Sequence, residues 1–420
     1  MKQVLIVQLA RMGDLLQSKR LVLSVLAEHN TEAHLLVDES LKGLAEVLYP
    51  ECHVHSIAAS ALLGERVQDV FYDPLVTQRL LTQCLQSLHA LPLAQIEKVY
   101  FLNSTPLSLA LARLFEPEQC VGFWSSQGQT GRDKWVSLVE RFTEHRPSTP
   151  LNLIDYWGYF HPNPIAPSLV NPIARMAGSG RIGVVLSGQV ARRSLPSDVL
   201  ALCLQAIFQA KDGPTFVLLG TKNERRLARE VLGALPAPIV KQVEDLTGKT
   251  GLLDLEGIFS GLDMILTPDT GLMHMATHYG VPVQGFFLSS AWCFETGPYG
   301  LGHKIWQSVA MCSPCLETEP CPYDVQCLQP FRDPAFLAYL SGRFEDRWAK
   351  GLCGFVSNFD SFGTTYTRVD GEDNFASLRA QKRGLLKETM LGELESLPKE
   401  TGELVYRERD WQLPERIKIS

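Results

Sequence analysis

The chain has 420 residues, of which 45% are hydrophobic and 20% charged, and its formal net charge at pH 7 is −7. This composition is typical of a folded protein of about two or three domains and excludes a disordered or collagen-like chain. The acidic balance argues against nucleic acid as a partner. No apolar run reaches the ~20 residues that cross a bilayer, and the start of the chain lacks a signal peptide, so we expect a cytoplasmic protein.

The first third of the chain alternates short apolar runs with longer helical patterns. The runs predict strands at Val4–Leu9, His34–Val37, His53–Ile57, Lys98–Leu102 and Cys120–Phe123, and the patterns predict helices at Leu15–Glu28, Leu41–Leu48, Val67–Leu91 and Pro106–Leu114. Apolar strands separated by helices indicate a parallel sheet covered on both faces.

A linker rich in proline and glycine, residues 161–180, interrupts this alternation, which then restarts. Strands are expected at Ile182–Leu186, Thr215–Leu219, Ile239–Val243, Met264–Leu266 and Val281–Phe287, and helices at Pro196–Ala210, Asn223–Leu235, Leu252–Ser260 and Gly271–Tyr279. The pattern predicts an α/β protein with two Rossmann-like halves. From Pro330 onward the pattern indicates a helical and irregular tail.

Two strand ends carry residues suited to a ligand site. After the first strand, Gly13 permits a tight turn and Asp14 begins the next helix, where a carboxylate is also favoured simply by the helix dipole. Later, Asp269, Thr270 and Gly271 join a strand to a helix whose first amides are unpaired, which suits a diphosphate. The alternative explanation for this second turn is ordinary helix capping.

Other polar residues lie near the second turn. His274 and His278 are four positions apart on one helix, but without a nearby third ligand they indicate packing or hydrogen bonding more than zinc. Arg192 and Arg193 follow another strand end and could clamp phosphate or be solvated surface residues. Glu224, one strand later, could accept hydrogen bonds from ribose hydroxyls or stabilise a helix start.

These residues occur together in an order that resembles glycosyltransferase family 9, the ADP-heptose:lipopolysaccharide heptosyltransferases and their relatives. The matching segments, which span about residues 1–330, are Met12-Gly13-Asp14, Arg193-Ser-Leu-Pro196, Gly220…Glu224, Pro268-Asp269-Thr270-Gly271-x-x-His274 and Thr296-Gly297-Pro298-Tyr299-Gly300. Asn103–Phe115, Val121-Gly122 and Leu153-Ile-Asp155 also match. The resemblance implies the GT-B architecture, with two facing Rossmann-like domains and the donor nucleotide in the second.

The resemblance also implies roles for individual residues. Asp14 matches the catalytic base and Glu224 the ribose contact. Arg193 matches a donor-diphosphate contact that is usually lysine. The loop that binds the donor sugar and phosphate is matched by Asp269, Thr270, Gly271 and His274.

The sequence departs from the family pattern at four places. Arg193 and Leu195 replace the usual lysine and tryptophan, Lys19-Arg20 stands where proline is usual, and Leu288–Glu295 replaces a Phe-Gly turn.

Four of the ten cysteines crowd into one short segment. Cys312, Cys315, Cys321 and Cys327 could form a tetrahedral site for a structural zinc or iron ion, and reduced thiols or a disulfide pair are the alternatives. Some relatives that transfer the second heptose have counterparts of these cysteines.

The sequence as a whole predicts a metal-independent, inverting glycosyltransferase that moves heptose from ADP-heptose to a glycolipid or lipopolysaccharide-type acceptor and needs no cofactor for catalysis. We expect an acceptor-binding domain at residues 1–165, a donor-binding domain at 166–330 and an extension at 331–420 that packs on the body. A basic, amphipathic stretch near residues 379–397 is compatible with peripheral contact with the inner membrane. The alternatives are another GT-B enzyme, such as a sugar-nucleotide epimerase or a protein glycosyltransferase, and a non-catalytic nucleotide-sugar or metal-binding scaffold.

Overall fold

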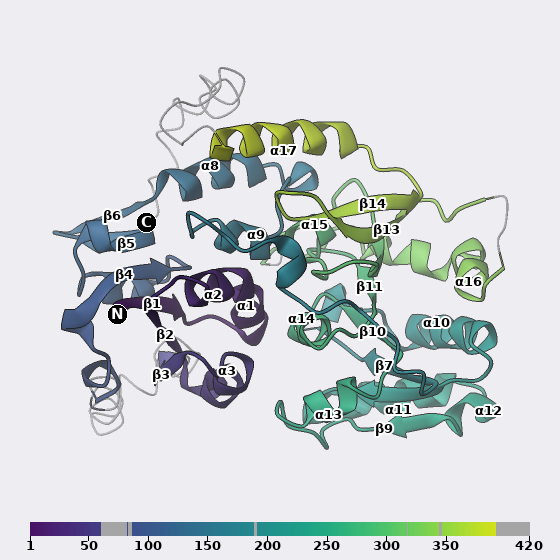
Figure 1. The fold of residues 1–420 in the computed structure, drawn as a ribbon. Helices are drawn as coiled ribbons and strands as arrows, with labels where there is room; N and C mark the ends of the chain where they lie inside the picture. Colours follow the sequence, from purple (N-terminus) through teal and green to yellow (C-terminus); the bar gives the residue numbers. More distant parts are fainter. Residues whose placement is uncertain (60–81, 83–85, 189–190, 317, 344–346, 392–420) are drawn as a thin grey trace.

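The fold consists of two α/β units that stand side by side (Figure 1). The structure is a computed structural model that describes residues 1–59, 82, 86–188, 191–316, 318–343 and 347–391. The N-terminal unit is purple and blue in Figure 1, and the C-terminal unit is teal, green and yellow. This arrangement confirms the predicted α/β class with two Rossmann-like halves.

The N-terminal unit is built on a six-stranded sheet with the order β3-β2-β1-β4-β5-β6, in which only the β5–β6 pair is antiparallel. Its strands are β1 (Lys2–Gln8), β2 (Thr31–Asp38), β3 (His53–Ile57), β4 (Ile96–Phe101), β5 (Cys120–Ser126) and β6 (Gln129–Arg132). Its described helices are α1 (Met12–Gln17), α2 (Lys19–Leu26), α3 (Lys42–Leu48), α7 (Pro106–Ala112), α8 (Lys134–Thr143) and α9 (Leu153–Gly158). The apolar residues of β1 and β2 are buried, as continuous hydrophobic strands require.

Three features of this unit differ from the sequence prediction or lie outside it. The helix expected at Leu15–Glu28 is two helices, because the chain breaks at Ser18, whose hydroxyl donates to the Leu15 carbonyl oxygen at 2.7 Å. The predicted helix Val67–Leu91 lies largely outside the described residues. The elements β6, α8 and α9 were not predicted, although the apolar residues Trp135, Leu138, Val139 and Phe142 of α8 have the spacing of an amphipathic helix.

The C-terminal unit has an eight-stranded sheet with the order β14-β13-β12-β11-β10-β7-β8-β9. Its strands are β7 (Arg181–Val185), β8 (Thr215–Leu219), β9 (Val243–Asp245), β10 (Met264–Pro268), β11 (Val283–Phe287), β12 (Lys304–Ser308), β13 (Leu352–Phe359) and β14 (Thr364–Asp370). Its helices are α10 (Ser197–Ala210), α11 (Arg225–Ala234), α12 (Ala237–Val240), α13 (Leu255–Phe259), α14 (Gly271–His278), α15 (Cys293–Thr296), α16 (Pro334–Leu340) and α17 (Ala376–Leu391). The strands from β7 to β12 pair in parallel, and β13 and β14 add antiparallel strands at one edge.

One predicted strand of this unit, Ile239–Val243, was wrong over most of its length. Ala237–Val240 forms the short helix α12, which begins after Pro236, and the strand β9 starts only at Val243. Proline is favoured at the start of a helix and cannot donate to a sheet, so the proline before this apolar run decides its structure.

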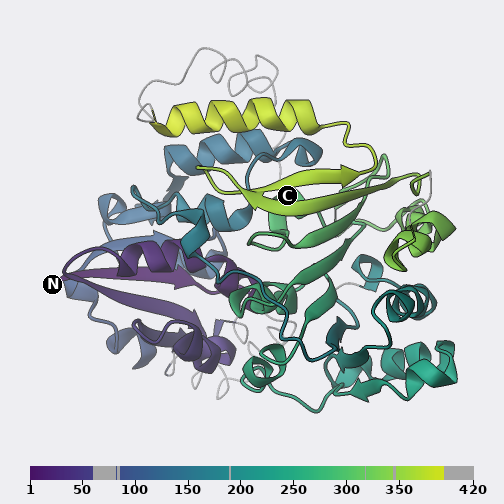
Figure 2. The same ribbon diagram turned by 45° about the vertical axis from the view of Figure 1, so that its right-hand side comes forward.

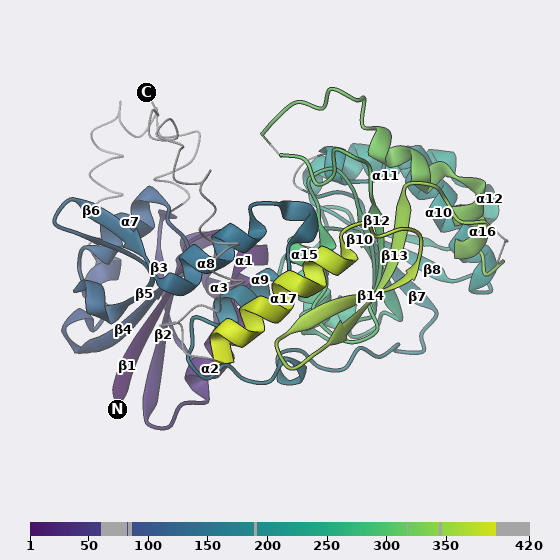
Figure 3. The same ribbon diagram turned by 90° about the horizontal axis from the view of Figure 1, so that it is seen from above.

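The described part of the tail that follows Pro330, residues 331–343 and 347–391, packs on the body of the protein. Besides helices it contains the strands β13 and β14, which extend the second sheet, and α17 then runs back along α8 of the N-terminal unit (Figures 2 and 3). The basic residues of α17 serve this docking, because Arg379 donates to the Pro147 carbonyl oxygen at 2.9 Å and Lys382 to that of Phe142 at 2.9 Å. Within the described residues, no helix is both long and apolar enough to cross a membrane.

A buried ion pair of the N-terminal unit is also bonded by residues of the C-terminal unit. Arg20 of α2 is 1% exposed, Asp155 of α9 is 0% exposed, and the Arg20 Nη1 atom donates to Asp155 Oδ1 at 2.6 Å. From the C-terminal unit, the Tyr299 hydroxyl donates to Asp155 Oδ1 at 2.6 Å and the Thr364 backbone N–H to Oδ2 at 2.8 Å. A Cβ atom at Gly363 would lie 2.1 Å from Asp155 Oδ2, so only glycine permits this close approach.

Lys19 makes a second polar contact between the units. Its Nζ atom donates to His278 Nδ1 of α14 at 2.8 Å and to Asn171 Oδ1 at 3.0 Å. Burial lowers the pKa of Lys19 to about 8. The Lys19-Arg20 pair, where the sequence departs from the family pattern, therefore contributes two contacts that fix α2 against the rest of the protein.

We expect Arg20→Met to lower the free energy of unfolding by about 3–5 kcal/mol, because it leaves the buried Asp155 carboxylate without its partner cation. Chemical denaturation followed by circular dichroism measures this change. The control is Arg226→Ala, which removes an exposed i,i+4 pair with Glu230 and should change stability by less than about 0.5 kcal/mol. Equal effects of the two variants would contradict a structural role for the buried pair.

Candidate active site between the two units

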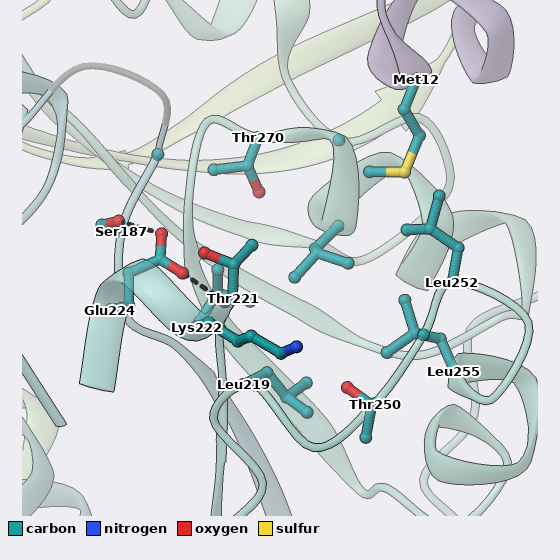
Figure 4. Close-up of a pocket in the computed structure, with 17 residues that line it drawn as sticks. Met12, Ser187, Leu219, Thr221, Lys222, Glu224, Thr250, Leu252, Leu255 and Thr270 are labelled. Carbon is teal, nitrogen blue, oxygen red and sulfur yellow. Dashed lines mark hydrogen bonds between the residues drawn. The ribbon is translucent and has the colours of Figure 1, made fainter. Parts of the chain in front are cut away.

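A cavity of about 520 Å³ lies at the carboxyl ends of β7, β8 and β10 (Figure 4). Parallel α/β sheets bind ligands at this edge, where loops connect the strands to the following helices. The lining residues are Met12, Val185, Ser187, Gly188, Leu219, Gly220, Thr221, Lys222, Glu224, Gly248, Thr250, Gly251, Leu252, Leu255, Thr270, Gly271 and Leu272. All of them except Met12 belong to the C-terminal unit, so a single residue of α1 closes the cavity from the other side.

The first turn of α14 faces both the cavity and α1. Thr270 is the N-cap residue in an extended conformation, and no side chain caps the helix, so its first amides are not satisfied by a cap. The backbones of α1 and α14 come very close, because a Cβ atom at Gly271 would lie 2.3 Å from Met12 Cε and 3.3 Å from the Gly13 nitrogen. Gly271 therefore allows the two helix starts to meet, whereas a Cβ atom at Gly13 would make only an ordinary contact, 3.6 Å from Gly271 Cα.

The polar wall of the cavity is organised by Glu224. The Ser187 hydroxyl donates to Glu224 Oε1 at 2.7 Å, and the Thr221 backbone N–H donates to Oε2 within a capping box. Lys222 and Thr250 lie beside the apolar side chains of Leu219, Leu252 and Leu255 (Figure 4). A flat apolar region next to a carboxylate is the kind of surface that receives a nucleobase and its ribose.

A charged group adjoins this cavity. Arg193, at the end of the short 3₁₀ helix Ala191–Arg193, donates from Nη2 to Asp269 Oδ2 and to the Asp269 carbonyl oxygen at 3.3 Å. The Thr296 hydroxyl donates to the same Oδ2 atom at 2.8 Å. The structure thus brings together Arg193 and Asp269, and pairs them directly.

Asp14 lies in the first turn of α1 and is half-buried. Its Oδ2 atom accepts a hydrogen bond from the Arg11 backbone N–H at 3.1 Å, so the carboxylate also stabilises the helix start. Burial raises the pKa of the Asp14 carboxyl, and the negative charge of Asp269 adds to this rise, against the lowering effect of Arg11. Asp14 and Asp269 are therefore close enough to influence each other across the boundary between the units.

The two histidines of α14 are held neutral by their surroundings. His274 is 4% exposed, and burial lowers its pKa to about 4. Burial and the neighbouring charge of Lys19 lower the pKa of His278 to about 3. His278 takes part in the contact with Lys19, which supports the expected hydrogen-bonding role.

The cysteine cluster forms a separate cavity of about 190 Å³, and all four thiols line it. The Ser289 hydroxyl lies 3.3 Å from Cys315 Sγ, and the Val325 backbone N–H donates to Cys321 Sγ at 3.3 Å. Among the described residues, however, no group of three or more histidine, cysteine or carboxylate side chains is placed to hold a metal ion. The predicted zinc or iron site at Cys312, Cys315, Cys321 and Cys327 is therefore not supported by the described residues.

The site contains residues that the sequence did not single out. Met12 was noted only as part of a motif, and Lys222, Thr250, Leu252 and Leu255 carry no local signal, because their apolar or flexible side chains are common throughout the chain. Thr296 belongs to a quoted motif, so its position in the sequence was a usable signal for a role at the site.

Comparisons with known proteins agree with this arrangement. Residues 205–324 match the model of glycosyltransferase family 9 (heptosyltransferase). The chain is similar to this family. No curated protein sequence matches the chain.

Solved structures share the fold at low sequence identity. The glycosyl transferase family 9 structure from Veillonella parvula DSM 2008 is 14% identical, with a TM-score of 0.53 over 75% of this chain and 90% of that one. The ADP-heptose lps heptosyltransferase II of E. coli is 17% identical, with a TM-score of 0.47 over 71% and 88%. The iron-containing dodecameric glycosyltransferase TibC of enterotoxigenic E. coli H10407 is 11% identical, with a TM-score of 0.45 over 81% and 75%. The similarity to the Veillonella parvula structure supports the GT-B fold of two Rossmann-like domains, as the resemblance to family 9 implied.

The neutral histidines of α14 predict how stability depends on pH. Because the folded-state pKa values of His274 and His278 lie below the unfolded value of about 6.5, the unfolded chain binds more protons as the pH falls from 6.5 toward 4. Stability should therefore fall over this range, by up to about 1.4 kcal/mol per pH unit for each histidine. Denaturation at several pH values should show a shallower fall in His278→Gln, whereas a variant of the exposed His29, His29→Gln, should retain the full slope. A His278→Gln slope equal to that of the original chain would contradict this assignment.

Proposed function

We propose that the protein is an inverting glycosyltransferase that moves a sugar, heptose from ADP-heptose, to a hydroxyl group of a saccharide or glycolipid acceptor. The observation that carries the proposal is the nucleotide-sized cavity at the strand ends of the C-terminal unit, which Met12 lines from the N-terminal unit, two residues before Asp14 in the first turn of α1. In this proposal residues 1–165 bind the acceptor, residues 166–330 bind the donor, and residues 331–420 pack on both. The similarity of residues 205–324 to family 9 supports the choice of reaction.

The donor would lie along the wall of the cavity. The apolar side chains of Leu219, Leu252 and Leu255 suit the faces of the base, and the Glu224 carboxylate suits the ribose hydroxyls, since it already accepts hydrogen bonds there. The first amides of α14 and the Arg193 guanidinium would receive the diphosphate, because unpaired helix amides and forked donors both favour phosphate oxygens.

The transfer step would use charges from both units. Asp14 takes the proton of the acceptor hydroxyl, the oxygen attacks the anomeric carbon, and the bond from that carbon to the diphosphate breaks with inversion. Arg193 and the α14 amides stabilise the negative charge that develops on the diphosphate. The chain's own residues supply a base and anion contacts, so we propose that no cofactor takes part in the step.

The proposal extends to where the protein acts. A glycolipid or lipopolysaccharide-type acceptor would place the reaction in the cytoplasm, at the inner face of the inner membrane. Within the described part of α17, Arg379 and Lys382 contact the protein itself, so we do not assign a membrane contact to these residues.

A donor panel tests the reaction class. ADP-heptose, other ADP-sugars, UDP-sugars and GDP-sugars are each offered to the protein, and both binding and donor consumption are measured. We expect ADP-heptose to bind most tightly and to be consumed with release of ADP. Conversion of a nucleotide sugar into an isomer without release of the nucleotide would instead identify an epimerase, and binding without any turnover would identify a scaffold.

Asp14→Asn should preserve the fold and donor binding but reduce turnover by about 10² to 10⁴-fold, as expected for the loss of a general base. In the original protein, activity should fall as the pH drops through the pKa of Asp14, and because that pKa is raised, the loss should begin above the range of an ordinary aspartate near 3.8. Steady-state kinetics across pH measures both effects. Turnover in Asp14→Asn close to that of the original protein would remove Asp14 from the mechanism.

Arg193→Ala should weaken the binding of ADP, because a charge-assisted contact to phosphate contributes ~1.5–3 kcal/mol. Arg193→Lys should regain part of the affinity, since a single ammonium group still offers a charge without the fork. Isothermal titration calorimetry gives the three affinities. Unchanged affinity in Arg193→Ala would show that the diphosphate does not reach this side chain.

A further inference from the structure

Arg146 of the N-terminal unit reaches across to three segments of the C-terminal unit. It begins the short 3₁₀ helix Arg146–Ser148 after α8. Its Nε atom donates to Glu295 Oε1 at 2.9 Å and its Nη2 atom to Oε2 at 2.5 Å. It also donates to the backbone carbonyl oxygens of Ser290 and Cys315, each at 2.9 Å. One guanidinium therefore binds a carboxylate with a fork and holds two backbone loops.

Among the residues that the structure describes, the N-terminal unit supplies the hydrogen bonds to the Glu295 carboxylate. Besides the bonds from Arg146, which include one from Nε to Oε2 at 3.2 Å, its Oε1 atom accepts from the Thr149 hydroxyl at 3.3 Å. Burial acts to lower the pKa of Arg146, but the Glu295 carboxylate outweighs it and raises the pKa, so the guanidinium stays charged. The pair is only partly exposed, at 28% and 21% for the two side chains, which limits screening by solvent.

Thr296, the residue after Glu295, contacts the ion pair between Asp269 and Arg193. Thr296 is the last residue of α15, and its hydroxyl donates to Asp269 Oδ2 at 2.8 Å, beside the ion pair between Asp269 and Arg193. Since α15 has only four residues, an anchor at Glu295 sets the position of Thr296 directly. Contacts therefore run from Arg146 to Glu295 and, one residue along the chain, from Thr296 to Asp269.

We propose that Arg146 is a positioning residue, which holds Glu295 and thereby keeps the Thr296 hydroxyl on Asp269, so that the donor-binding loop reaches its working geometry only when the two units are docked. The inference rests on the proposed function, and it concerns how Asp269 is oriented and not what binds there. The segment Leu288–Glu295, in which the sequence departs from the family pattern, supplies the residue that Arg146 holds.

The expected effect is on the rate of the chemical step. A displacement of about 1 Å in a group that orients the reacting atoms can cost roughly 10²-fold in rate. Under the proposed function ADP is held by the leucine wall, Glu224, Arg193 and the first amides of α14, and neither Arg146 nor Thr296 is among these contacts. Loss of Arg146 should therefore lower kcat and leave the donor KM and the affinity for ADP nearly unchanged.

The test compares Arg146→Ala, Thr296→Val and the double variant by steady-state kinetics and by calorimetry with ADP. Each single variant should lower kcat by roughly 10- to 100-fold, with ADP affinity within about 2-fold of the original protein. The double variant should be no slower than the worse single variant, because both changes break the same series of contacts. Arg146→Lys should regain part of the rate, since lysine can donate to one oxygen of Glu295.

Arg383→Ala is the matched control. Arg383 also bridges the units, with two bonds of 2.8 and 2.7 Å to the Asp360 carboxylate and one of 2.7 Å to the Pro150 carbonyl oxygen, but these contacts do not involve α15. It should lower the melting temperature about as much as Arg146→Ala does and leave kcat unchanged.

Three results would overturn the inference while leaving the proposed function intact: equal losses of kcat in Arg146→Ala and Arg383→Ala, a Thr296→Val enzyme with the original kcat, or fully additive losses in the double variant. If the original protein neither binds ADP nor consumes any donor, the proposed function fails and this inference fails with it.

Discussion

The hydrogen bonds to the buried Asp155 carboxylate are the interaction on which the docking of the two units depends. The carboxylate accepts hydrogen bonds from Arg20 of the first unit and from Tyr299 and Thr364 of the second, with no exposure to solvent. A buried charge is expensive unless every partner is in place, so this arrangement is stable in one geometry only. The same geometry lets the backbones of Gly13 and Gly271 come together. A structural ion pair therefore determines the distance across which the proposed chemistry would occur.

Several negatively charged groups lie close together at the site. Asp14 and Asp269 approach each other from opposite units, and a diphosphate would add further negative charge to the same place. Two nearby arginines offset part of this charge: Arg193 pairs with Asp269, and Arg146 pairs with Glu295. Under the proposed function, Arg193 shares its donors between Asp269 and the donor phosphate, and Asp14 is left as the carboxylate whose raised pKa suits a base. The positions of the charges follow from how the units are docked, since neither unit carries all of them.

The sequence predicted the parallel sheets and the strand ends that carry Asp14, Glu224 and Asp269, because short apolar runs followed by glycine and a carboxylate give a local signal. It did not predict β13, which pairs with β12 far away in the sequence, or β14, which pairs with β13 at the edge of the sheet. Pro236 before α12 and Pro238 in its first turn favour a helix start where the apolar run suggested a strand. The contacts from Arg146 and Lys19 to the other unit join residues more than a hundred positions apart, and nothing local marks them. The cysteine spacing suggested a metal site that the described geometry does not support.

The most direct measurement of the central claim, that a donor site in one unit is completed by a base from the other, is a crystal structure of the protein with ADP or a non-hydrolysable ADP-sugar bound. We predict that the adenine ring lies against Leu219, Leu252 and Leu255 and that the ribose lies on Glu224. The diphosphate should contact Arg193 and the first amides of α14, and the Asp14 carboxylate should face the anomeric carbon. A nucleotide bound elsewhere, or bound in this cavity with Asp14 turned away from the sugar, would contradict it.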